Sequence, residues 1–121
     1  MLITVDFSSA QPLADQVAGA VRAALAGGTA GPGDRLPSAR NVAATLGINL
    51  HTVLRGYQQL RDEGLVELRR GRTAVISGTA DQLRLRLAAA AEEFAKAARQ
   101  AGASDEEALA AARQALHNLR D

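Results

Sequence analysis

The chain has 121 residues and a formal net charge of +1, and 47% of its residues are hydrophobic. This length fits one domain, or one small domain with an appendage, and the hydrophobic share excludes a chain that is disordered throughout. Cysteine is absent and histidine occurs twice, which excludes a disulfide framework and argues against a structural zinc site. The sequence shows no signal peptide and no membrane-spanning run. We therefore expect a soluble, cytoplasmic protein without metal or cofactor.

Charge is unevenly distributed along the chain. Residues 1–78 hold eight arginines against six acidic residues, a balance of +2, whereas residues 79–121 hold five arginines and one lysine against seven acidic residues, a balance of −1. Arginine forms bidentate contacts with phosphate and guanine. A cluster of arginines is therefore compatible with nucleic-acid binding. Composition alone is explained equally well by a solvated charged surface. One 38-residue stretch contains Arg35, Arg40, Arg55, Arg69, Arg70 and Arg72.

The first part of the chain contains one predicted strand and one predicted helix. Residues 2–6 alternate apolar and polar side chains, which is typical of a short strand. Over residues 10–25 the apolar residues recur at helical spacing, which predicts an amphipathic helix. Gly27 and Gly28 then end this helix, and a turn-rich loop follows at residues 31–34.

Two short helices and the turn between them form the next unit. Ser38 can cap a helix that ends at Leu46, and Gly47 can adopt the left-handed conformation that stops it. Asn49 can then cap a second helix over residues 50–63. A turn this short prevents the two helices from lying antiparallel, so the second helix presents an exposed face. The pattern predicts a helix-turn-helix.

A basic hairpin follows the second helix. Residues 65–68 and 73–76 are predicted to be short strands, and the residues between them are Arg69, Arg70, Gly71 and Arg72. A four-residue hairpin loop with a glycine is common, but three arginines in such a loop repel one another unless an anion lies nearby. The hairpin is therefore typical of a wing that contacts a polyanion.

The remaining residues predict a pair of helices. Asp81 can cap a helix that ends near residue 100, and Ser104 with Glu107 forms a capping box for a second helix. The apolar residues of each helix recur at spacings of three and four, which is the repeat of helices packed lengthwise. A lone antiparallel hairpin buries too little surface to be independent, and the simplest partner is a second copy of itself. The residues expected in this dimer contact are Leu83, Leu87, Ala90, Phe94, Ala97, Leu109, Ala112, Leu116 and Leu119.

Taken in order, the residues from Pro32 to Arg72 resemble the GntR family of bacterial regulators, and the short helical end is most similar to the YtrA subfamily. The resemblance rests on LPSAR at residues 36–40, on the run at residues 60–66 with its Asp-Glu-Gly-Leu, and on the Arg-Arg-Gly wing. It implies a mostly α fold with a small β wing. A winged helix-turn-helix DNA-binding domain would occupy residues 1–78, and a two-helix dimerisation hairpin residues 79–121.

The resemblance also implies roles for individual residues in binding double-stranded DNA. Arg40 matches an arginine that recognises a guanine in the family, and Ser38 matches a phosphate-binding position. Gly71 matches the residue at the tip of the wing that enters the minor groove. The start of the second helix matches positions that contact bases and backbone, which here are Asn49, His51 and Thr52.

Other residues extend or modify this predicted surface. Arg55 lies on the exposed face of the second helix, and the wing arginines are suited to phosphate and minor-groove contacts. Arg35 has two alternatives, a phosphate or an ion pair with Asp34. Many relatives carry arginine where this chain has Leu50 and Leu54, and leucine there can pack against thymine methyl groups or sugars.

Two functions of different classes are compatible with these residues. The first is a homodimeric repressor that binds a palindromic operator near its own operon, with half-sites roughly 34 Å apart. The second is a protein-interaction module that uses the helix-turn-helix as a scaffold, and such a module has no need of an arginine-rich wing. The sequence shows no catalytic triad, phosphate-binding loop or metal-ligand spacing, so we do not expect an enzyme. Whether a small effector binds between two copies stays open.

Overall fold

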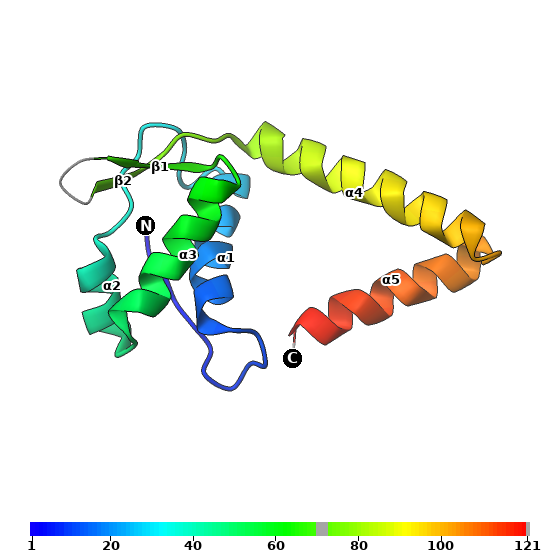
Figure 1. The fold of residues 1–121 in the computed structure, drawn as a ribbon, viewed down its shortest axis with the longest axis horizontal. Coiled ribbons are helices and arrows are strands. Elements are labelled where there is room, and N and C mark those ends of the chain that lie inside the picture. The colour runs from blue at the N-terminus through cyan, green and yellow to red at the C-terminus, as the bar shows by residue number, and fades with distance from the viewer. Residues whose placement is uncertain (70–72, 121) are drawn as a thin grey trace.

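The computed structural model, which describes residues 1–69 and 73–120, consists of a winged head and a long helical arm (Figure 1). We use "head" for residues 1–78 and "arm" for residues 79–120. The described elements confirm the predicted fold class, which is mostly helical with one small antiparallel wing. In chain order they are α1 (Leu13–Ala26), α2 (Ala39–Leu46), α3 (Leu50–Asp62), β1 (Val66–Arg69), β2 (Thr73–Ile76), α4 (Ala80–Gln100) and α5 (Asp105–Arg120).

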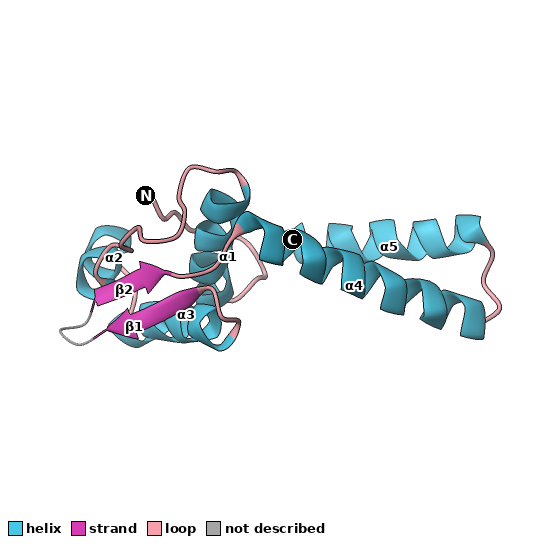
Figure 2. Ribbon diagram, turned by 90° about the horizontal axis from the view of Figure 1, so that it is seen from above, coloured by secondary structure: helices cyan, strands magenta, loops and turns pink. Residues whose placement is uncertain are grey.

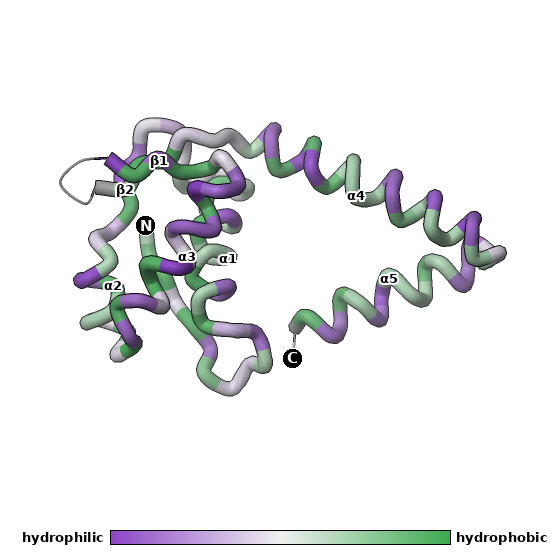
Figure 3. Tube along the Cα trace, in the orientation of Figure 1, coloured by the Kyte–Doolittle hydropathy of each residue, from purple (hydrophilic) through white to green (hydrophobic). Residues whose placement is uncertain are grey.

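The head is held together by the crossing of α1 and α3. Val17 of α1 and Val53 and Leu60 of α3 are fully buried in one aliphatic core. Figure 3 shows hydrophobic and hydrophilic residues mixed along both helices, as expected of helices that bury one face. Gly56 lies at the crossing, where a methyl group would stand only 2.8 Å from the carbonyl oxygen of Ala14. The two helices therefore approach more closely than any residue with a side chain would allow.

The helix-turn-helix is built on the predicted caps. The Ser38 hydroxyl accepts a hydrogen bond from the Asn41 amide at 3.1 Å, and the side-chain oxygen of Asn49 accepts one from the His51 amide at 2.8 Å. Between these two caps, Gly47 ends α2 in the left-handed conformation with φ of 68°. These residues fix where α2 ends and where α3 begins, as expected from their helix-capping preferences.

The wing contains β1 and β2 in antiparallel pairing, and the two strands lie across the head helices (Figure 2). The segment before α2 joins them, because the Leu36 amide donates to the Ala74 carbonyl and the Ile76 amide donates to the Asp34 carbonyl, both at 2.8 Å. This agrees with the extended conformation that a proline imposes on the residue before it. β1 begins one residue later than predicted and includes Arg69.

The strand predicted at residues 2–6 is wrong. Ile3 is buried and Val5 is half-buried, so the alternating pattern reflects packing against the head core. The backbone of Asp6 is bound by the Gln16 side chain instead of a neighbouring strand. The Gln16 amide oxygen accepts from the Asp6 amide at 2.7 Å, and its amide nitrogen donates to the Asp6 carbonyl at 3.0 Å.

Two helices begin at other residues than predicted. α1 begins three residues later than expected, because Pro12 is extended and stands at its N-cap with φ of −56° and ψ of 143°; earlier in the chain the Asp6 carboxylate accepts hydrogen bonds from the amide and the hydroxyl of Ser8. Asp81 does not cap α4. The cap is Thr79, whose hydroxyl accepts from the Gln82 amide while the Gln82 side chain accepts from the Thr79 amide. This reciprocal pair satisfies two amides that have no partner inside the helix.

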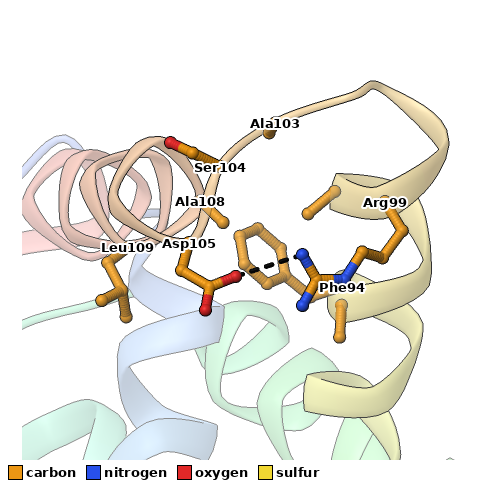
Figure 4. A pocket seen from close by; sticks show the side chains of 9 residues that line it. Phe94, Arg99, Ala103, Ser104, Asp105, Ala108 and Leu109 are labelled. Atoms are coloured by element: carbon orange, nitrogen blue, oxygen red, sulfur yellow. Dashed lines mark ion pairs between the residues drawn. The ribbon is translucent and has the colours of Figure 1, made fainter.

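The two arm helices reverse direction as predicted, but they diverge from their connecting loop instead of packing along their lengths (Figure 1). The predicted capping box is confirmed, since the Ser104 hydroxyl and the Glu107 carboxylate each accept a hydrogen bond from the other's backbone amide at 3.1 Å. The helices meet at an elbow near Phe94, where Arg99 and Asp105 form an ion pair at 3.1 Å (Figure 4). Two alanine-rich helices bury too little surface to stay together beyond this elbow.

The first turns of α4 pack against the head. Leu83, which was expected in the dimer contact, lies against the head core. Gly78 is buried at the junction, where a methyl group would stand 2.6 Å from a leucine side chain of the head. Glu63 accepts hydrogen bonds from Arg22 of α1 at 2.6 and 3.0 Å and lies 3.8 Å from Arg86 of α4. These contacts tie the arm to α1 and to the end of α3.

Candidate nucleic-acid interface

A hollow of about 460 Å³ lies between α2, α3 and the wing. Three leucines contribute to its lining: Leu50 and Leu54 from α3 and Leu68 from β1. Ser38 and Arg40, at the start of α2, line the same hollow. The structure therefore places two residues predicted to contact DNA beside an apolar surface formed by the second helix and the wing.

Arg40 is the clearest candidate for a ligand contact. It is the second residue of α2 and is exposed, and no ion pair involving it occurs within residues 1–69 and 73–120. A guanidinium group has five N–H donors and matches the two acceptors of guanine or the oxygens of phosphate. Ser38 already uses its hydroxyl as an acceptor for the α2 cap, so its remaining hydrogen-bonding capacity is the hydroxyl proton.

The start of α3 holds four predicted contact residues in different surroundings. His51 and Arg55 are exposed one turn apart, whereas Thr52 is half-buried. The side-chain oxygen of Asn49 caps the helix, which leaves its amide group as a donor. The face that contains His51 and Arg55 is thus exposed for contact, and Asn49 contributes mainly to how α3 begins.

Tyr57 links α3 to the entry of α2. Its side chain is buried and also lines the hollow, and its hydroxyl donates a hydrogen bond to the Pro37 carbonyl at 2.6 Å. Burial raises the pKa of Tyr57 to about 12, because the phenolate would lose its hydration in the protein interior. The hydrogen bond holds the residue that precedes Ser38, and it therefore positions the start of α2 relative to α3.

The basic residues of the wing and of the loop before α2 are only partly described. Arg69 stands 3.5 Å from Glu67 in an exposed ion pair, which contributes little and leaves Arg69 available. Arg35 forms no ion pair with Asp34 in the described part of the chain, and the Asp34 carboxylate accepts from the Gly31 amide at 2.9 Å. Three further predicted residues lie outside the described residues: Arg70, Gly71 and Arg72.

Besides two alanines, Ala39 and Ala74, sequence reasoning missed Leu68 and Gln58 among the residues that line the hollow. The spacing of four residues from Leu50 to Leu54 and again to Gln58 places all three on one face of α3, so Gln58 could have been found from helical periodicity. Leu68 could not, because its position depends on how the wing packs against α3. It is 44% exposed and faces the same hollow.

The described residues contain no group of three or more histidine, aspartate or glutamate side chains placed to hold a metal ion. In the same residues, no helix has both the length and the apolar character needed to cross a membrane.

A helix-turn-helix, an antiparallel wing and an exposed arginine that forms no ion pair within the described residues define this chain as a winged helix-turn-helix protein of the DNA-binding class. The family model for bacterial regulatory proteins of the gntR family matches residues 13–76. The chain belongs to the GntR family.

Individual relatives are similar to this chain along most of its length. The HTH-type transcriptional regulator Rv1152 of Mycobacterium tuberculosis is 35% identical over 107 residues, which cover 88% of each chain. The HTH-type transcriptional repressor YtrA of Bacillus subtilis is 35% identical over 79 residues, 65% of this chain and 61% of that protein. The structure of YtrA from Sulfolobus acidocaldarius, a GntR-family transcription factor, matches with a TM-score of 0.60 and 33% identity over 76% of this chain and 99% of that one. The chain is thus a YtrA-like, DNA-binding transcription regulator and not an enzyme.

Proposed function

We propose that two copies of this chain form a cytoplasmic repressor that binds a palindromic operator near its own operon. The observation that carries this proposal is that one chain combines a DNA-binding head with an arm whose apolar surface is uncovered. The 35% identity to a protein named as a repressor supports the sign of regulation. A dimer with two-fold symmetry presents two identical heads, and such a dimer matches a palindrome with half-sites roughly 34 Å apart.

Each head would contact DNA through α2, α3 and the wing. In this proposal Arg40 recognises a guanine, and the other basic and polar residues bind phosphates or neighbouring bases, so that base contacts specify the sequence and phosphate contacts position the protein. The lack of an Arg35–Asp34 ion pair in the described structure supports a phosphate as the partner of Arg35. The proposed contact residues are Arg35, Ser38, Arg40, Asn49, His51, Thr52, Arg55, Arg69, Arg70, Gly71 and Arg72.

The arms would form the dimer contact. Leu87 and Phe94 of α4 are 72% and 42% exposed, and Leu109 and Leu116 of α5 are 57% and 58% exposed. Burial of such surface stabilises an assembly by about 25 cal/mol per Å². Because α4 and α5 diverge, a single chain does not cover its own apolar positions, and a second copy can pack against them. The proposed contact residues are Leu87, Ala90, Phe94, Ala97, Leu109, Ala112, Leu116 and Leu119.

The dimer is tested with a pair of matched variants on one helix. Leu87→Glu should dissociate the dimer, because it places a charge in the proposed contact. Leu85→Glu is the control, since Leu85 is 71% exposed and lies about 200° further round the helix, on the opposite side from the proposed contact. Both should leave the head folded. Sedimentation equilibrium measures the association, and an equal effect of the two variants would contradict the proposed contact.

DNA recognition is tested with a second matched pair. Arg40→Ala should weaken binding by about 1–3 kcal/mol per half-site and relax the sequence preference at one position. Arg61→Ala removes an exposed arginine from the other end of α3 and should leave affinity and preference nearly unchanged. Binding is measured by fluorescence anisotropy on a duplex selected by the full-length protein. If neither the wild type nor the variants selected any duplex, a protein-interaction module would be the better description.

A further inference from the structure

The hollow beside α3 has a chemistry that the phosphate and guanine contacts do not explain. Leu54 is 37% exposed and Leu68 is 44% exposed, although they lie on the surface that carries Arg40. Leu50 is half-buried, packs against the head core and lines the same hollow. An arginine or a polar residue at these places would suit phosphate oxygens, whereas leucine offers no hydrogen bond to DNA. The leucine part of the lining therefore suits an apolar group of DNA better than a phosphate.

We infer that this hollow recognises the C5-methyl groups of thymines in the operator, with Leu54 and Leu68 as the residues that determine this preference. In the major groove, the thymine methyl is the apolar group that a base pair presents at its edge. The inference rests on the proposed function, since it assumes that the α3 face faces the bases. It deepens that function by assigning A·T pairs to positions near the guanine that Arg40 recognises.

The geometry of the head supports this assignment. Leu50, Leu54 and Gln58 lie on one face of α3 at intervals of four residues, and all three line the hollow. The opposite side of α3 is occupied by α1, against which Gly56 packs closely. A helix held in this way inserts into a groove with its leucine face outward. Gln58 adds a carboxamide at the same surface, the group that pairs with the adenine edge.

The competing occupant of an apolar hollow of this size is a small apolar ligand, which would bind in the absence of DNA. Continuity with Ser38 and Arg40 favours DNA, because both side chains line the same hollow and would flank any base edge placed in it. Deoxyribose carbons are a second apolar surface of DNA, and they are the same in every nucleotide. Replacing thymine by uracil removes the methyl group alone and therefore separates base recognition from sugar packing.

The experiment uses the full-length chain and a duplex that it selects from a random-sequence library. Each dT in the selected duplex is replaced in turn by deoxyuridine, and the affinity is measured by anisotropy for the wild type, Leu54→Ala, Leu68→Ala and the control Leu85→Ala. In the wild type and the control, one or two replacements per half-site should weaken binding about fourfold each, which corresponds to about 0.8 kcal/mol for one buried methyl group. In Leu54→Ala or Leu68→Ala the same replacements should have almost no effect.

Two results would overturn the inference alone. In one, the selected duplex binds tightly and no replacement by deoxyuridine changes the affinity. In the other, replacements weaken the wild type and both leucine variants equally, which would place the methyl contact elsewhere on the protein. Selection of no duplex at all would overturn the proposed function together with this inference, so the two failures are distinguishable.

Discussion

Replacing Tyr57 by phenylalanine should change the pH dependence of stability in a way that can be calculated from its surroundings. The pKa of Tyr57 is raised from an ordinary value of 10.0 to about 12 by burial. The folded protein therefore holds this proton more tightly than the unfolded chain does. This tighter proton binding adds to the free energy of unfolding. The added stability is fully present below pH 10 and is lost as the pH rises from about 10 to about 12. At about 1.4 kcal/mol per tenfold change in proton affinity, the total is about 3 kcal/mol.

Tyr57→Phe separates this titration from the hydrogen bond. At neutral pH the variant should be less stable by about 1 kcal/mol, because the Pro37 carbonyl loses the hydrogen bond that it accepts at 2.6 Å. Above pH 12 the variant should be the more stable protein, since it has no phenol to ionise. The order of stability of the two proteins should therefore reverse between pH 10 and pH 12.

Urea unfolding followed by circular dichroism at a series of pH values measures this reversal. The assay is specific because Tyr57 is the single tyrosine and Lys96 the single lysine of the chain, and tryptophan is absent. The absorbance of tyrosinate then reports the ionisation of Tyr57 directly. If wild type and variant lost stability in parallel between pH 10 and 12, the burial of the Tyr57 hydroxyl would be wrong; if the two proteins were equally stable at neutral pH, its hydrogen bond to Pro37 would be wrong.

Three further substitutions, all followed by urea unfolding, test the packing and the ion pairs of the head. Gly56→Ala should destabilise the head, because the added methyl group meets the Ala14 carbonyl at 2.8 Å. The cost of overpacking, about 1–3 kcal/mol, outweighs the gain in helix propensity of about 1 kcal/mol. Gly19→Ala is the matched control, and it should be stabilising because the space around Gly19 is open. Glu63→Gln should lower stability by about 1 kcal/mol at low salt, and the difference should shrink as added salt screens the half-exposed pairs with Arg22 and Arg86. A salt-independent difference would show that packing, not charge, carries the effect.

Much of the fold follows from local chemistry that is visible in the sequence. Ser38, Gly47 and Asn49 are a cap, a stop and a second cap within twelve residues, and each acts on backbone groups next to it. The Ser104–Glu107 box forms for the same reason. Such features need no knowledge of distant residues. The strand expected at residues 2–6 was wrong because a strand needs a neighbouring strand, and whether one lies there is a property of the whole chain.

The candidate site likewise has one part that could be predicted from the sequence and one part that could not. Arg40 could be singled out because its motif is local, and the structure shows it exposed and unpaired in the described part of the chain. The apolar hollow could not be predicted as a hollow. It exists because β1 brings Leu68 to the same hollow that Leu54 of α3 lines, and this arrangement depends on the tertiary packing of the wing. The divergence of α4 and α5 is another tertiary property, since their apolar spacing is equally compatible with a closed hairpin.

The junction between head and arm determines how a dimer would place its two heads. Gly78 is buried at this junction without room for a side chain, and Leu83 of α4 lies against the head core. Glu63 accepts from Arg22 of α1 and lies near Arg86 of α4, so its carboxylate contacts both parts of the chain. A junction packed in this way resists bending, and a change in the angle between α4 and the head would have to break these contacts. In the proposed dimer, the distance between the two α3 helices is then fixed mainly by the crossing of the arms. An effector that altered this crossing would move both heads together, because each head follows its own α4.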